Sequence, residues 1–275
     1  MLRERIATIL ILFPVLLWMI ILGGWPFAVG MALILTQAVL EFGRMFRAAG
    51  YRPATPLMAA GVLTLAISRA AWGFNHTPVI LSALLLAGMV WHTLDYERGA
   101  ERSGTDFGIT IAGVLYVGWM GSYLISLRML PDGLWWLLLV LPTIWLADGM
   151  AYMIGKRWGR HKLARRVSPK KTWEGYLGGA VFGVLICSWL VTVWQHGAGP
   201  DSSLTLQLGA AVGVVVGFLA PIGDLGVSMI KRQTHLKDSG RLLPGHGGAL
   251  DRMDSWLWAG AIGYTLLQFL IYGSL

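Results

Sequence analysis

Long apolar runs separated by short polar segments make up almost the whole chain. A transmembrane helix needs about 20 mostly apolar residues, and a helix suits the bilayer because it pairs its backbone polar groups internally. Runs of about this length cover residues 6–23, 26–44, 56–73, 78–94, 107–127, 133–157, 173–194, 206–231 and 252–273. The pattern therefore predicts an all-α fold: a polytopic integral membrane helical bundle of about nine transmembrane helices.

The cations fall almost entirely in alternate connections between these runs. With the N-terminus in the cytoplasm, all of the 22 Lys and Arg residues except Arg69 and Arg128 lie on the cytoplasmic side. Because basic segments are retained in the cytoplasm, this separation predicts an N-in, C-out topology in the inner (cytoplasmic) membrane. The net charge of +8 then belongs to one membrane face, so we expect membrane lipid and no nucleic acid as a partner.

Composition agrees with the apolar pattern. The chain is 56% hydrophobic and 13% charged, whereas about a quarter of the residues of a soluble domain are charged. The single cysteine, Cys187, lies inside an apolar run. A lone cysteine excludes an internal disulfide and a cysteine metal cluster.

Polar chemistry divides the chain into two parts. Residues 1–105 carry almost no polar side chains suited to a site, so we expect N-terminal membrane helices that serve as a scaffold and offer a lipid groove. In this part we expect Arg69 to snorkel toward the outer surface and His92 to lie at the membrane interface. Residues 106–275 hold the remaining chemistry, and we expect them to form the catalytic membrane region.

Four aspartates lie near the predicted cytoplasmic ends of three runs. Asp148 belongs to the sixth run and Asp224 to the eighth, while Asp251 and Asp254 share one helical face at the start of the ninth. Carboxylates gathered at one depth repel one another unless a cation holds them, and Mg²⁺ prefers hard oxygen ligands with substrate phosphates. We therefore expect Mg²⁺, with or without a second cation, bound by Asp224, Asp251, Asp148 and Asp254.

Basic and glycine-rich segments beside these aspartates suit phosphate oxygens. We expect Pro169 to open the seventh helix, whose N-terminus would bind an anion together with Lys170 and Lys171. Gly247 and Gly248 would let the backbone approach a ligand closely. The residues alone thus indicate metal-dependent phosphoryl or nucleotidyl transfer at the inner leaflet. Further polar residues placed to contact a substrate are Ser228, Lys231, Arg232 and His246.

Two segments resemble the signatures of the phosphatidate cytidylyltransferases, the CDP-diacylglycerol synthases. Residues 168–175 match the family segment Ser-Pro-Lys-Lys-Thr-x-Glu-Gly throughout. Departures from the longer family pattern are confined to Ala249, where a larger apolar residue is preferred, and Val227, where some relatives carry an acid. The residues of the longer segment that fall in register are Ser228, Lys231, Arg232, Lys237, Asp238, Gly240, Pro244, His246, Gly247, Gly248, Asp251, Arg252 and Asp254.

The resemblance implies a reaction of CTP with phosphatidic acid that gives CDP-diacylglycerol and pyrophosphate at the cytoplasmic membrane face. It also suggests a homodimer. The catalytic residues that it implies are Asp224, Asp251, Lys231, Arg232, Lys237 and Asp238. The substrate-binding residues that it implies are Ser168, Lys170, Lys171, Ser228, His246, Gly247, Gly248 and Arg252.

Two alternatives stay open from the sequence. The segment that begins at Asp148-Gly149 is similar to one of the CDP-alcohol phosphotransferases, but it lacks the arginine of that family's segment. A membrane ion or solute transporter would carry ionisable residues across the full membrane depth, whereas here they gather on one side. A flux assay on reconstituted protein would separate a transporter from an enzyme.

Overall fold

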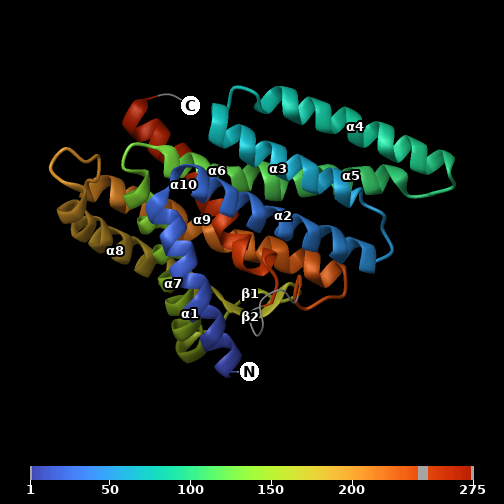
Figure 1. The fold of residues 1–275 in the computed structure, drawn as a ribbon. Helices are drawn as coiled ribbons and strands as arrows, with labels where there is room; N and C mark the ends of the chain where they lie inside the picture. Colours follow the sequence, from blue (N-terminus) through green and yellow to red (C-terminus); the bar gives the residue numbers. More distant parts are fainter. Residues whose placement is uncertain (1, 241–246, 274–275) are drawn as a thin grey trace. The chain divides into compact units, whose positions relative to one another are not determined.

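The computed structural model describes residues 2–240 and 247–273, and helices dominate them (Figure 1). A π-helical segment, Val114–Trp119, joins α5 and α6 into one continuous helical stretch. The α-helices are α1 (Leu2–Leu22), α2 (Gly24–Ala48), α3 (Thr55–Trp72), α4 (Thr77–Glu97), α5 (Ser103–Gly113), α6 (Met120–Met129), α7 (Gly133–Trp158), α8 (Trp173–Ala198), α9 (Leu206–Gln233) and α10 (Leu250–Tyr272).

Six helical stretches in the described residues are long and apolar enough to cross a membrane: α2, α4, α5 to α6, α7, α8 and α9. Each coincides with one of the predicted runs. The remaining runs correspond to α1, α3 and α10, which are helical but fall outside this set. A multi-pass helical membrane protein is therefore supported, while the count of nine spans and the N-in, C-out topology stay predictions.

A short β-hairpin interrupts the helical pattern between α7 and α8. Its strands, β1 (Lys162–Ala164) and β2 (Ser168–Thr172), pair antiparallel. The all-α prediction is thus corrected at this point, and so is the prediction that Pro169 opens a helix. The helix begins instead at Trp173, because the Thr172 side chain accepts a hydrogen bond from the Gly175 backbone N–H at 3.2 Å and caps it.

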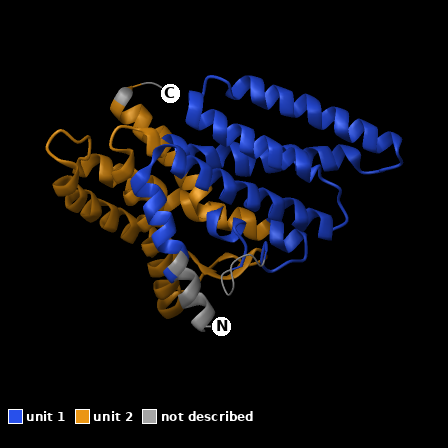
Figure 2. Ribbon diagram, viewed as in Figure 1, with its two compact units in different colours: residues 1–126, 230–253 blue, residues 127–229, 254–275 orange. Residues whose placement is uncertain are grey.

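The described chain divides into two compact units (Figure 2). Unit 1 comprises residues 1–126 and 230–253, and unit 2 comprises residues 127–229 and 254–275. Helices α9 and α10 each contribute residues to both units. The expected functional division between residues 105 and 106 is a separate matter and stays a prediction.

Within unit 2, small residues bring the helix backbones close together. A Cβ at Gly179 of α8 would press against Ala147 and Ala151 of α7, and a Cβ at Gly217 of α9 would press against Ala180 of α8. Membrane helices associate through such small residues, because close backbone approach replaces the hydrophobic driving force that water would supply. This packing holds α7, α8 and α9 around the cavity described below.

Unit 1 contains buried polar side chains, so the expectation that spans one to four lack them is wrong. Glu41, Arg69 and His92 of these spans are buried, and so is Asp106 of α5. The Arg69 guanidinium lies 3.4 Å from the ring centroid of Phe74, and a cation over an aromatic face is stabilised without reaching water. Arg69 therefore does not snorkel.

His92 is buried within the protein as well, and its place at the membrane interface stays a prediction. Its Nε2 is 2.9 Å from the Thr110 hydroxyl, and the Thr110 hydroxyl also lies 3.0 Å from the Ala54 backbone N–H, whose hydrogen bond it accepts. Asp106 accepts a hydrogen bond from the Arg52 backbone N–H at 2.8 Å. These contacts tie α4 and α5 to the connection before α3.

Candidate active site

Unit 2 encloses a cavity of about 660 Å³ whose walls come from α7, the hairpin, α8 and α9. Its apolar wall is built from small residues, including those that let the three helices approach. Its polar wall carries both positively and negatively charged side chains. The charged residues that line it are Asp148, Lys156, Lys162, Lys170, Lys171 and Asp224.

The clearest contact in this cavity joins Lys171 of β2 to Asp224 of α9. The Lys171 Nζ is 2.5 Å from Asp224 Oδ2, and the two side chains are 30% and 32% exposed. The Ser228 hydroxyl donates to the other carboxylate oxygen at 3.2 Å, from one helical turn further along α9. Asp224 is therefore oriented by two partners while it stays open to the cavity.

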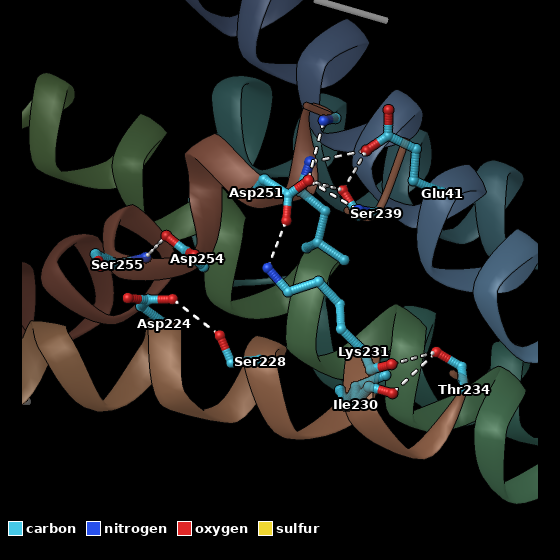
Figure 3. A network of polar contacts seen from close by, with 12 residues as sticks. Glu41, Asp224, Ser228, Ile230, Lys231, Thr234, Ser239, Asp251, Asp254 and Ser255 are labelled. Carbon is cyan, nitrogen blue, oxygen red and sulfur yellow. Dashed lines mark hydrogen bonds and ion pairs between the residues drawn. The ribbon is translucent and has the colours of Figure 1, made fainter. Parts of the chain in front are cut away.

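A second carboxylate–lysine pair lies in unit 1, in the first turn of α10 (Figure 3). Lys231 Nζ donates to Asp251 Oδ1 at 2.7 Å. Asp251 Oδ2 accepts from the Ser239 backbone N–H at 2.8 Å, from the Ser239 hydroxyl at 3.0 Å and from the Gly248 backbone N–H at 3.0 Å. The two charged side chains are only 12% and 6% exposed, so this pair is nearly closed to water.

These hydrogen bonds decide the charge state of Asp251. Burial by itself would raise the pKa of this carboxyl. The hydrogen bonds from Lys231 and from the backbone N–H groups of Gly248 and Ser239 outweigh burial and leave the pKa below its ordinary value. Asp251 is thus held as a carboxylate.

Glycine is required at positions 247 and 248, shortly before Asp251, because the backbone there lies very close to neighbouring side chains. Gly247 has a φ of 83°, which favours glycine, and a Cβ there would lie 2.8 Å from Asp251 Oδ2. A Cβ at Gly248 would collide with the side chains of Glu41 and Ser239. The described contacts of both glycines are therefore with carboxylates of the chain itself, and their expected role toward a substrate stays a prediction.

Sequence reasoning missed Glu41 and Ser239. The Ser239 hydroxyl lies 3.0 Å from Glu41 Oε2 as well as 3.0 Å from Asp251 Oδ2, so Ser239 links the two carboxylates. A signal for Glu41 was present, because an ionisable residue inside an apolar run is costly and usually marks a function. Sequence reasoning also passed over Lys156 and Lys162, which appeared only as part of the general positive charge.

The predicted site residues divide between the units. Unit 2 holds Asp148, Ser168, Lys170, Lys171, Asp224, Ser228 and Asp254, and unit 1 holds Lys231, Arg232, Lys237, Asp238, Gly247, Gly248, Asp251 and Arg252. Four of the first set line the cavity: Asp148, Lys170, Lys171 and Asp224.

Several predicted residues contribute less to the described geometry. Asp254 is buried, and its Oδ1 accepts a hydrogen bond from the neighbouring Ser255 backbone N–H at 2.7 Å. The exposed residues of the second set are Arg232, Lys237, Asp238 and Arg252. The predicted phosphate contact of His246 lies outside the described residues.

The donor chemistry of the cavity fits a magnesium ion. Among the residues that the structure describes, no group of three or more His, Cys, Asp or Glu side chains is gathered closely enough to hold a metal. Mg²⁺ is commonly bound by one or two carboxylates together with substrate phosphates. Asp148 and Asp224 provide two carboxylates on one cavity, which is the number that this mode of binding uses, and the four-aspartate site stays a prediction.

Cations and carboxylates line one cavity in a bundle of apolar helices typical of a multi-pass membrane protein. A family model described as "Cytidylyltransferase family" matches residues 3–270. The chain therefore belongs to the cytidylyltransferase family, and it is a nucleotidyltransferase. This membership confirms the resemblance seen in the two sequence segments and favours it over the phosphotransferase and transporter alternatives.

Individual relatives agree with the family match. A phosphatidate cytidylyltransferase of Pseudomonas aeruginosa is 36% identical, with 93% of each chain covered. One of Synechocystis sp. is 31% identical over 98% of this chain and 97% of the relative. One of Staphylococcus haemolyticus is 32% identical over 93% of this chain and 95% of the relative.

Proposed function

We propose that the chain is a phosphatidate cytidylyltransferase, which transfers CMP from CTP to phosphatidic acid and releases pyrophosphate. The observation that carries this proposal is the cavity of unit 2, where four lysines and two aspartates surround a space of about 660 Å³. Both substrates are anions, and one of them is a lipid whose phosphate rests at headgroup level. The similarity to relatives named for this activity supports the same substrates.

The reaction needs no nucleophile from the protein. A phosphate oxygen of phosphatidic acid forms a bond to the α-phosphorus of CTP, and the bond from that phosphorus to the pyrophosphate oxygen breaks. The protein must align these groups and neutralise their charge. The lysines on the cavity wall, Lys156, Lys162, Lys170 and Lys171, are placed for that role.

Lys171 is the residue that we expect to change partner during substrate binding. Its ammonium group already contacts Asp224 at 2.5 Å on a partly exposed wall. A phosphate that enters the cavity offers a doubly charged alternative partner, and a partly exposed ion pair is weak enough to exchange. Release of Lys171 would leave the Asp224 carboxylate available, with the Ser228 hydroxyl still holding one oxygen.

We further propose that Asp148 and Asp224 hold Mg²⁺ together with the nucleotide phosphates. When bound there, the ion would neutralise the phosphates and steady the pyrophosphate leaving group. The predicted participation of Asp251 and Asp254, a second cation, the cytoplasmic orientation of the site and a homodimer are retained as parts of this proposal. Lys231, Arg232, Lys237 and Asp238 keep their predicted catalytic roles.

The test is product formation by purified protein in mixed micelles of detergent and phosphatidic acid, with CTP labelled at the α-phosphorus. Labelled CDP-diacylglycerol should form with CTP and Mg²⁺, and it should be absent when phosphatidic acid is left out or EDTA is added. ATP, GTP and UTP at the same concentration test the base. Folded protein that forms no lipid product from any of the four nucleotides would overturn the proposed function, and product from all four would overturn the choice of CTP.

A further inference from the structure

Glu41 of α2 is a fully buried carboxylate in a mostly apolar helix that is long enough to cross a membrane. Removing an ionisable group from water is expensive unless its oxygens are hydrogen-bonded, so a carboxylate in such a helix usually has a function. Both carboxylate oxygens of Glu41 accept hydrogen bonds. Oε1 accepts from the Gln37 side-chain amide at 3.1 Å, and Oε2 accepts from the Ser239 hydroxyl and the Leu250 backbone N–H, each at 3.0 Å.

The two partners of Oε2 stand on either side of the glycine-containing segment that leads into α10. Ser239 precedes residues 240–249, and Leu250 is the first residue of α10. One carboxylate oxygen on α2 thus joins both flanks of this segment (Figure 3). Side chains at Gly240 and Gly248 would collide with the Glu41 carboxyl group, so the backbone at these two glycines approaches it closely.

The contact with Leu250 also caps α10 from another helix. The first backbone N–H groups of a helix lack partners within that helix, and a negative charge at this end is favourable. Glu41 supplies both an acceptor and a negative charge to the first turn of α10. That same turn carries Asp251, so Glu41 fixes the backbone from which Asp251 projects.

Ser239 connects Glu41 to Asp251 a second time. Its hydroxyl carries one proton and lies 3.0 Å from a carboxylate oxygen of each residue, so it can donate to only one of them at a time. The Ser239 backbone N–H holds Asp251 independently at 2.8 Å. Asp251 therefore keeps a link to Ser239 while the hydroxyl donates to Glu41.

We propose that Glu41 is a positioning residue of the active site: it holds Ser239 and the first turn of α10 so that Asp251 stays aligned with Lys231. The inference rests on the proposed function, in which Asp251 and Lys231 act in nucleotidyl transfer. Glu41 acts through these residues and is assigned no contact with substrate. A merely structural role would instead stabilise unit 1 without a specific effect on turnover.

The test compares Glu41→Leu with Asp106→Leu, which removes another buried carboxylate of unit 1 that bonds to the Arg52 backbone N–H. Rates of CDP-diacylglycerol formation are measured over a range of both substrates, on variants that elute as folded protein. Glu41→Leu should lower kcat roughly hundredfold, because misplacement by about 1 Å has that effect, with little change in either KM. Asp106→Leu should lower the unfolding temperature and leave kcat near that of the unaltered protein.

Two further variants separate positioning from general destabilisation. Glu41→Gln should retain most of kcat, since its carbonyl oxygen can accept from both Ser239 and Leu250. Ser239→Ala should lower kcat, and its effect should be smaller in the Glu41→Leu background, because residues that act through one link are not additive. Should Glu41→Leu not fold, Glu41→Gln and Ser239→Ala carry the test, and a wild-type kcat for Ser239→Ala would then overturn the inference.

The remaining outcomes are also decisive. Wild-type kcat in folded Glu41→Leu, or an equal loss in Asp106→Leu, overturns the inference while the proposed function stands. If the losses of kcat caused by Glu41→Leu and by Ser239→Ala multiply fully in the double variant, the link through Ser239 is overturned. Unaltered protein that forms no CDP-diacylglycerol overturns the proposed function, and this inference with it.

Discussion

The described residues include two lysine–aspartate pairs of similar length and different surroundings. In unit 1, Lys231 and Asp251 lie 2.7 Å apart with side chains 12% and 6% exposed, and backbone N–H groups complete the shell of the carboxylate. In unit 2, Lys171 and Asp224 lie 2.5 Å apart with about a third of each side chain exposed, on the wall of a cavity. The distance between the charges therefore says little about what each pair does.

The difference in burial indicates that the two ion pairs have different roles. A closed and fully hydrogen-bonded pair is costly to break, because each charge would be left unpaired away from water. A pair open to a cavity contributes little to stability and can exchange partners when a phosphate enters. We therefore expect Lys231–Asp251 to hold a fixed geometry in its catalytic role and Lys171–Asp224 to exchange partners when substrate binds.

The largest effect should follow from breaking the closed pair. Lys231→Met leaves Asp251 buried without its cation and should destabilise the protein by about 3–5 kcal/mol, besides abolishing turnover. Thermal unfolding in detergent measures the loss. The double variant Lys231→Met with Asp251→Leu should recover most of the stability and none of the activity, whereas an unchanged unfolding temperature in the single variant would contradict the comparison.

A smaller effect, of a different kind, is expected for the open pair. Lys171→Met should change the free energy of unfolding by only about 0–1 kcal/mol, as is usual for an exposed ion pair. It should raise the KM for CTP roughly tenfold or more, because a hydrogen bond to a charged phosphate is worth about 1.5–3 kcal/mol. Initial rates over a CTP series check this, with Arg98→Met, an exposed cation outside the cavity, as the control.

A still smaller effect should follow from removing the helix cap beside the cavity. Thr172→Ala deletes the hydroxyl that accepts from the Gly175 N–H and should cost about 1 kcal/mol. The cations of the cavity are untouched, so kcat should change little. Thr172→Ser keeps the hydroxyl and serves as the matched control; a loss of kcat in Thr172→Ala but not in Thr172→Ser would show that the cap also orders the site.

The smallest effect concerns the acid-side pH dependence of stability that Asp251 contributes. Its pKa is below the ordinary value, since hydrogen bonds from Lys231 and two backbone N–H groups outweigh burial. The stability that this gives is present above the pKa of an unfolded aspartate and is lost as the pH falls through the lower folded value. Unfolding temperatures should therefore drop on the acid side in wild-type protein, and Asp251→Asn should lose that part of the dependence; parallel curves would contradict it.

The helices could be predicted from the sequence because each apolar run is long and the runs are separated by short segments that are charged, polar or rich in glycine. All nine predicted runs coincide with helices in the described residues, with boundaries that differ by a few positions. The hairpin could not be predicted in the same way. Residues 162–172 are rich in cations, and the pairing of β1 with β2 depends on contacts such as Lys162 with Thr172 that leave no periodic pattern.

Site residues could be predicted where charged residues cluster in one segment of the sequence. They could not be predicted where the site depends on contacts between residues far apart in the chain. Asp224 and Lys171 were assigned to phosphate and metal chemistry from their segments, and both line one cavity. Their direct contact joins residues far apart in the chain, so sequence spacing could not reveal it. Glu41 could have been singled out as an ionisable residue inside an apolar run, but its partners Ser239 and Leu250 could not, because they lie about two hundred positions away.

The most direct test of the account is turnover of Asp224→Asn, measured beside its unfolding temperature. The substitution keeps the shape of the side chain and removes the charge that faces the cavity. We predict that the variant unfolds within a few degrees of wild type and forms CDP-diacylglycerol from CTP and phosphatidic acid at least roughly a hundredfold more slowly. A folded variant that matches wild-type turnover would contradict the assignment of the unit 2 cavity as the place of reaction.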